Sequence, residues 1–226
     1  MPVADSINAK LRSMKQAGRV RDVREKGALG EAVVLDVMHE LRTKRGGLLM
    51  QGFMYPYASN RQGKIYVGNI FYDKNRQPPF YDVTSQLNDE IDILYISYYR
   101  IFAIEVKSYH ARKMVLQKNG WMTREGSAME KAPTAQAEKH VRHLYHQLYD
   151  VLPDGNPNYI IPIVCFVDEC SVTDERDQDL ANYMPVCPLN TLQQTVLLYD
   201  RPLGGYTLDL DMIQKKLKMI QTERTI

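Results

Sequence analysis

The chain has 226 residues, of which 44% are hydrophobic and 25% are charged, and its formal net charge is +2. These values are ordinary for a soluble globular protein that can bury a full core. Its apolar runs fall short of the roughly 18 residues that a transmembrane helix needs, so we predict neither a membrane span nor a membrane partner.

The first residues lead into basic ones without an apolar segment, so no secretory signal is predicted. The three cysteines are an odd number and lack the spacing of a zinc site: Cys165, Cys170 and Cys187. Both observations favour reduced thiols and a cytoplasmic location. A disulfide or a metal role for these cysteines is the less favoured alternative.

The near-neutral total conceals an uneven distribution of charge. Residues 1–26 contain seven lysines and arginines against three acidic residues, whereas residues 150–180 contain eight acidic residues against one arginine. Such asymmetry allows a cationic face for a polyanion. A charged face that simply contacts solvent is the common alternative.

Residues 5–24 are rich in helix formers, and Ile7, Leu11 and Met14 are spaced for one helix face. We therefore predict a basic helical N-terminal extension over residues 1–26. The extension either contacts nucleic acid, packs against the domain, or docks on a second copy of the chain in a homodimer.

The clearest helix is predicted over residues 27–45. Its apolar stripe is formed by Val34, Leu35, Met38 and Leu41. Glu31 lies about one turn before this stripe and continues its inward-facing side, where a carboxylate needs a partner. The alternative is that Glu31 merely occupies the first helical turn, where acidic residues are favoured.

A first strand is predicted over residues 48–58, and a long, turn-rich insertion follows at residues 59–89. Within the insertion, residues 65–67 and 70–72 flank a Gly-Asn turn and are expected to pair as a small hairpin. Its basic and aromatic side chains would contact phosphate and stack on bases of a nucleic acid. Packing of the insertion by its own aromatic residues is an equal alternative.

Two β-rich runs, residues 90–96 and 101–109, are predicted to form an antiparallel hairpin. With the turn between these runs, Asp92 falls opposite Glu105. Glu105 and Lys107 are two residues apart and share one face of the sheet. One sheet face is therefore expected to gather two carboxylates and an ammonium group.

Two neighbouring carboxylates suit a hard divalent cation, because Mg²⁺ takes one or two protein carboxylates together with water and substrate phosphate. We expect Asp92 and Glu105 to hold Mg²⁺ or Mn²⁺, with the carbonyl of Val106 as an extra ligand. Such a metal can bind a phosphodiester oxygen and lower the pKa of an attacking water. Lys107 would orient or help deprotonate that water, or stabilise charge on the phosphate. The alternative, an edge strand with solvated charges, fits poorly with the many apolar residues of both runs.

A second hairpin is predicted at residues 114–116 and 121–123, because an Asn-Gly pair between two apolar runs is a strong turn signal. Pro133 then opens a helix, which is an ordinary place for proline. The buried stripe of this helix is formed by Ala137, Val141, Leu144 and Leu148. A neighbouring polar face is formed by Gln136, His140, His143 and Gln147.

The same helix carries three histidines: His140, His143 and His146. They spread over about a third of the helix circumference and have no carboxylate partner in the sequence around them. We therefore favour solvated or phosphate-contacting roles for these histidines over metal ligation.

Residues 159–167 form a nearly continuous apolar run, which is typical of a strand buried on both faces. Pro162 predicts that this strand begins after the proline or lies near an edge of its sheet. The acidic segment that follows is predicted as a loop and a solvent-facing helix. A short strand at 186–189, a helix at 191–199 and a final amphipathic helix at 208–220 complete the chain.

The predicted order of elements is helix, strand, hairpin, helix, strand, helix. This order fits an α/β domain in which a mixed central sheet is flanked by helices. We divide the chain into the extension at 1–26, a domain over 27–200 that includes the insertion at 59–89, and a C-terminal turn and helix at 201–226.

These motifs resemble those of a known family. Asp92 within Glu-Ile-Asp, followed by Glu-Val-Lys at residues 105–107, resembles the signature of the PD-(D/E)XK nucleases and in particular their nuclease-related domain (NERD) branch. The branch carries a Gly-Glu pair on an early helix, matched at residues 30–31, and Pro-x-x-Gln on a later helix, matched at residues 133–136. The resemblance covers about residues 27–150 and extends to the apolar run near residue 163.

The resemblance implies a restriction-endonuclease-like core and a Mg²⁺- or Mn²⁺-dependent nuclease that hydrolyses phosphodiester bonds, with DNA expected as substrate and RNA open. It implies that Asp92 and Glu105 hold the metal, that Glu31 supports the metal or the water, and that Gln136 positions substrate. The alternative is a non-cleaving nucleic-acid-binding module or a subunit of a DNA-processing complex. A decayed module would be expected to lose Asp92, Glu105 or Lys107, and all three are present.

Overall fold

The structure is a computed structural model that describes residues 23–56, 64–66, 80–82, 88–108, 113–118, 122–124, 126–128, 133–167 and 171–221. Within these ranges, no helix combines the length and the apolar character needed to cross a membrane. The helix predicted at residues 5–24 lies almost wholly outside the described residues.

A five-stranded mixed sheet forms the centre of the fold, in the order β1-β4-β5-β9-β11. Its strands are β1 (Leu48–Pro56), β4 (Asn88–Ile96), β5 (Ile101–Lys107), β9 (Ile160–Phe166) and β11 (Val186–Pro188). The neighbours β1, β4 and β5 are antiparallel, whereas β5, β9 and β11 run parallel. Nearly all of β5 and all of β9 is buried, which explains their continuous apolar sequences.

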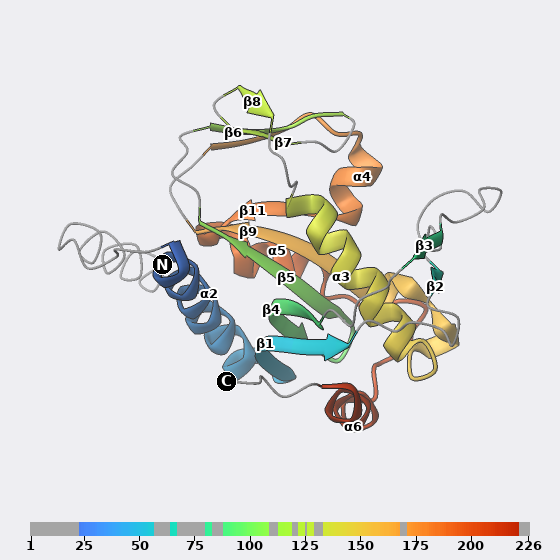
Figure 1. The fold of residues 1–226 in the computed structure, drawn as a ribbon. Coiled ribbons are helices and arrows are strands. Elements are labelled where there is room, and N and C mark those ends of the chain that lie inside the picture. Colours follow the sequence, from blue (N-terminus) through green and yellow to red (C-terminus); the bar gives the residue numbers. More distant parts are fainter. Residues whose placement is uncertain are drawn as a thin grey trace.

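Helices cover both faces of this sheet (Figure 1). The helices of the described residues are α2 (Val23–Arg45), α3 (Pro133–Leu148), α4 (Gln178–Tyr183), α5 (Leu192–Tyr199) and α6 (Leu210–Ile220), with short 3₁₀ turns η1 (Pro153–Gly155), η2 (Pro157–Tyr159) and η3 (Leu189–Thr191). Apolar side chains of α2 and α5 bury one face of the sheet, and those of α3 and α6 bury the other. The predicted α/β class is confirmed, and the arrangement is consistent with a restriction-endonuclease-like core.

A smaller four-stranded sheet lies beside the central one, in the order β10-β6-β7-β8. Its strands are β6 (Lys113–Leu116), β7 (Met122–Arg124), β8 (Ser127–Ala128) and β10 (Ser171–Asp174). The predicted hairpin is confirmed, because β6 and β7 pair with Leu116 opposite Met122. The prediction of a loop before the acidic helix is wrong at β10. This strand is mostly exposed, so it has no apolar alternation to reveal it, and it is held by parallel pairing with β6.

Within the insertion, β2 (Lys64–Tyr66) pairs antiparallel with β3 (Phe80–Asp82). The prediction that residues 65–67 pair with 70–72 is therefore wrong about the partner, and 70–72 lie outside the described residues. An apolar run indicates a strand but not the strand with which it pairs. A partner further along the chain is also possible, because a longer loop adds little to the entropic cost of pairing. The nucleic-acid contacts predicted for this insertion stay a prediction, since most of it is not described.

The prediction that the strand begins after Pro162 is wrong, because β9 includes this residue. The alternative, a place near an edge of the sheet, is confirmed, because among the described strands only β11 lies beyond β9. Val164 donates its N–H to the carbonyl of Pro185, on the β11 side. Pro162 lies two residues earlier, so its nitrogen faces the same side, but β11 pairs with β9 only from Val164 onwards. The missing N–H therefore costs no hydrogen bond of the ladder.

Two of the three cysteines lie side by side in the central sheet. Cys165 on β9 is opposite Cys187 on β11, and both side chains are buried. The reduced state expected for the cysteines stays a prediction. Cys170 lies outside the described residues.

Candidate active site

The candidate site lies where β4 and β5 separate. Ile93 and Ile104 are the last opposed residues of this antiparallel pair. Asp92 and Glu105 occupy the next position in the same register, as the sequence predicts.

β1 is distorted at the same level of the sheet. Gly52 has a φ of +60°, a region that glycine adopts without steric cost. In the pairing of β1 with β4, which lies within the described residues, Gln51 is opposite Ile93 and Phe53 is opposite Ile91, but Gly52 and Asp92 between them are not paired. The side chain of Asp92 instead accepts a hydrogen bond at its Oδ2 from the N–H of Val106 on β5, at 2.7 Å. The carboxylate thus fills the place that a backbone acceptor of β4 would take in a regular ladder.

Glu105 and Lys107 are joined directly. Glu105 is buried, with 2% of its surface exposed, and its Oε1 forms an ion pair with Nζ of Lys107. Lys107 also donates a hydrogen bond to Oε1 of Gln136 on α3, at 3.1 Å. Three of the residues predicted for the site therefore form one connected group.

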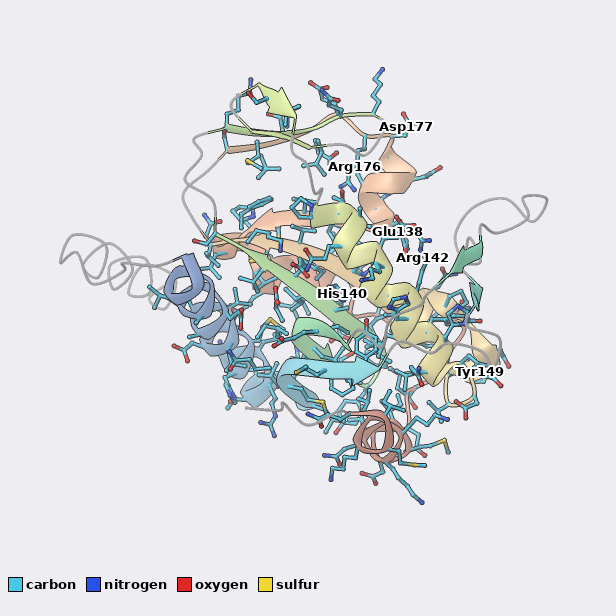
Figure 2. All side chains as sticks on the ribbon, viewed as in Figure 1. Glu138, His140, Arg142, Tyr149, Arg176 and Asp177 are labelled. Atoms are coloured by element: carbon cyan, nitrogen blue, oxygen red, sulfur yellow. The ribbon has the colours of Figure 1, made fainter. Side chains whose placement is uncertain are left out.

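The other oxygen of Glu105 faces a residue that the sequence did not assign to the site. Oε2 lies 3.1 Å from Nε2 of His140, although the two groups are not aligned as a standard hydrogen bond. Nδ1 of the same ring lies 3.4 Å from the hydroxyl of Tyr55 on β1. Figure 2 shows His140 on the sheet-facing side of α3, with Glu138 and Arg142 on the other side.

The predicted solvated or phosphate-contacting roles of the histidines are wrong for His140 and His143, because both side chains are buried. The ring of His143 lies edge-on to that of Tyr55, and His146 is half-buried. The buried face of α3 is wider than its apolar stripe, since the helix lies across the sheet. The sequence did place His140 on the same face of the helix as Gln136, one turn later, but a polar face gives no sign of its own burial.

The electrostatics of the site centre on Asp92. Burial, followed by the nearby charge of Glu105, raises the pKa of Asp92 to about 7. The hydrogen bond from Val106 and the charge of Lys107 oppose this rise, and the charge of Glu31 adds to it. At Asp92, the effect of the negative charges of Glu105 and Glu31 is therefore larger than that of the positive charge of Lys107. A bound cation would compensate this excess of negative charge.

Helix α2 brings Glu31 to the same end of the sheet. Gly30 allows this approach, because a Cβ at its position would lie 3.1 Å from Cγ2 of Val167. Glu31 is half-buried, and its Oε2 lies 3.5 Å from Nε2 of Gln51 on β1. Glu31 is also close enough for its charge to raise the pKa of Asp92 slightly.

The donor set fits a hard divalent cation. Among the described residues, no group of three histidine, cysteine or acidic side chains could hold a metal ion, so the candidate site offers two carboxylates and backbone. The N–H and C=O of a strand residue point to the same side, so the carbonyl of Val106 faces the side of Asp92. Asp92, Glu105 and this carbonyl suit Mg²⁺, which keeps several waters, and each carboxylate oxygen still has a lone pair beyond its protein contact.

Comparison with known proteins bears on the same region. A family model described as a nuclease-related domain matches residues 26–167, which include every residue of the site described above. The match also continues beyond residue 150, through β9. Neither the curated proteins nor the solved structures gave a significant match to the chain.

Proposed function

Because the chain belongs to the nuclease-related domain (NERD) family, we propose that it is a metal-dependent nuclease that hydrolyses phosphodiester bonds in DNA. The observation that carries the proposal is the meeting of Asp92, Glu105 and Lys107 at the point where β4 and β5 separate. Gln136 on α3 contacts Lys107, and Glu31 on α2, at the opposite face of the sheet, contacts Gln51 of the neighbouring strand β1.

Asp92, Glu105 and the carbonyl of Val106 would hold Mg²⁺ or Mn²⁺, which when bound supplies Lewis-acid polarisation of a phosphodiester oxygen and acidification of water. Burial of Glu105 keeps bulk water away from the carboxylate and strengthens its interactions. Asp92 has to be charged to serve as a ligand, so its raised pKa predicts weaker metal binding below about pH 7.

Lys107 is the residue best placed to act on the attacking water. Its ammonium group lies between Glu105 and Gln136, and its side chain is 19% exposed, so the amine is held by the protein yet open to substrate. We assign it to orienting the water and to stabilising the charge that develops on the phosphate. Gln136 holds this ammonium in place and presents its exposed amide to the substrate side. Glu31 would support the metal or the water from α2.

Cleavage assays on purified protein test the proposal. Supercoiled plasmid and single-stranded DNA are incubated with wild type in Mg²⁺ or Mn²⁺, with EDTA, and with a Glu105→Gln variant. Glu175→Gln is the matched control, because Glu175 is exposed and lies just after β10, in the smaller sheet. We expect metal-dependent cleavage by wild type and the control, and none by Glu105→Gln. If DNA is bound equally by all three proteins and cut by none, the protein is a binding module and the proposal is wrong.

A further inference from the structure

We propose that His140, with Tyr55 behind it, is a positioning residue that fixes the orientation of the Glu105 carboxylate for metal binding. The inference rests on the proposed function and names a part of the site that the sequence motifs leave out. It starts from the fact that both oxygens of Glu105 are approached by nitrogen, from Lys107 on one side and from His140 on the other.

The contact between Glu105 and His140 is buried, which makes it important for the orientation of both side chains. The side chains of Glu105 and His140 are 1% and 2% exposed, so water cannot take over the role of either partner. A buried carboxylate oxygen has a large cost of desolvation unless a donor faces it. The nitrogen of His140 therefore contributes to where that oxygen can lie, and not merely to the packing of α3.

The ring of His140 is itself held in a defined orientation. Its Nδ1 faces the hydroxyl of Tyr55, which is fully buried on β1, 85 residues away in sequence. A tyrosine hydroxyl can donate to Nδ1, which leaves the proton of the neutral ring on Nε2, the nitrogen that lies 3.1 Å from Oε2 of Glu105. The opposite tautomer would place two lone pairs against each other at Glu105, so the contacts assign the Nε2–H form.

The consequence concerns the geometry of the metal ligand. Contacts at both oxygens restrict rotation of the Glu105 carboxylate, while each oxygen keeps a lone pair for a metal ion. Partners that orient a ligating group in this way typically change metal affinity by about 10–100-fold when removed. We therefore expect His140 to set metal affinity without touching the metal or the substrate.

Calorimetric titration of the metal-free protein with Mn²⁺ alone measures this affinity without any catalytic turnover. We expect His140→Leu, which removes the donor, to weaken Mn²⁺ binding by about 10–100-fold. His140→Gln should recover most of the loss, because its amide nitrogen can replace Nε2–H. Tyr55→Phe should give a smaller loss than His140→Leu, since it removes only the hydroxyl behind the ring. His146→Gln on the same helix is the matched control and should bind like wild type.

Thermal unfolding identifies any variant that fails to fold. If His140→Leu fails to fold, His140→Gln and Tyr55→Phe still test the proposal. The proposal is overturned if folded His140→Leu binds Mn²⁺ like wild type, or if His140→Gln and His140→Leu lose affinity equally. A nitrogen NMR spectrum of wild type that shows the Nδ1–H tautomer for His140 would also overturn it. Glu105→Gln separates the two proposals: if that variant too binds Mn²⁺ normally, the metal site itself is wrong.

Discussion

The raised pKa of Asp92 makes the stability of the metal-free protein depend on pH. Burial and the charge of Glu105 raise this pKa from 3.8 to about 7. The folded state therefore keeps a proton at pH values where the unfolded state has released it. Because the folded pKa is the higher one, the stabilising contribution is complete below about pH 4 and is lost as the pH rises through about 7.

The size of this loss follows from the two pKa values. They differ by roughly three pH units at about 1.36 kcal/mol each, which gives a total of about 4 kcal/mol. Between about pH 5 and pH 8, the same values give a loss of about 2.6 kcal/mol in the free energy of unfolding. Asp92 is only half-buried, so solvent screens part of its charge. We therefore expect a measured loss of about 1–2.5 kcal/mol in the free energy of unfolding.

Urea unfolding in EDTA, between about pH 5 and pH 8, measures the loss in wild type and in Asp92→Asn. The asparagine keeps an oxygen acceptor for the N–H of Val106 but cannot ionise, so the variant lacks this pH dependence. We expect wild type to lose stability relative to the variant as the pH rises, and Mn²⁺ to reduce that slope by favouring the charged carboxylate. A stability difference that stays constant with pH refutes the reasoning.

Three further substitutions test separate parts of the account. Gly30→Ala should destabilise the fold by about 1–3 kcal/mol and lower cleavage, because its Cβ would press on Val167; unchanged urea unfolding would contradict the close approach of α2. Lys107→Ala should reduce single-turnover cleavage by about 10²–10⁴-fold, and near-wild-type rates would remove Lys107 from the chemistry. Arg176→Ala should cost about 1–3 kcal/mol through loss of hydrogen bonds to Asp174 and to the backbone. Its cleavage rate per folded molecule should stay at the wild-type value, and a loss of rate would show that the smaller sheet contributes to the site.

The sequence predicted well those parts of the site that are local in the chain. The β4–β5 hairpin has a short turn and strongly β-forming strands, so the facing positions of Asp92 and Glu105 follow from counting residues. The helices carrying Glu31 and Gln136 were equally clear, because each has an apolar stripe of helical period.

The parts that were missed depend on how distant elements dock. His140 appears as one polar residue among several on α3, and its burial follows only once that helix lies across the sheet beside Tyr55. The pairing of β2 with β3 likewise depends on contacts between segments that no local pattern connects. The start of β9 was misplaced for a related reason, since the strand tolerates Pro162 only because the neighbouring strand β11 begins to pair at Val164.

Single-turnover cleavage of an end-labelled DNA oligonucleotide in saturating Mn²⁺ tests the central claim most directly, with wild type, Glu105→Gln and Glu175→Gln compared at equal folded concentration. Removal of one ligand charge at a metal centre that performs the chemistry should lower the rate by at least about 10³-fold, with Glu175→Gln unaffected. A Glu105→Gln protein that cuts DNA at the wild-type rate would contradict the placement of a nuclease centre between β4 and β5.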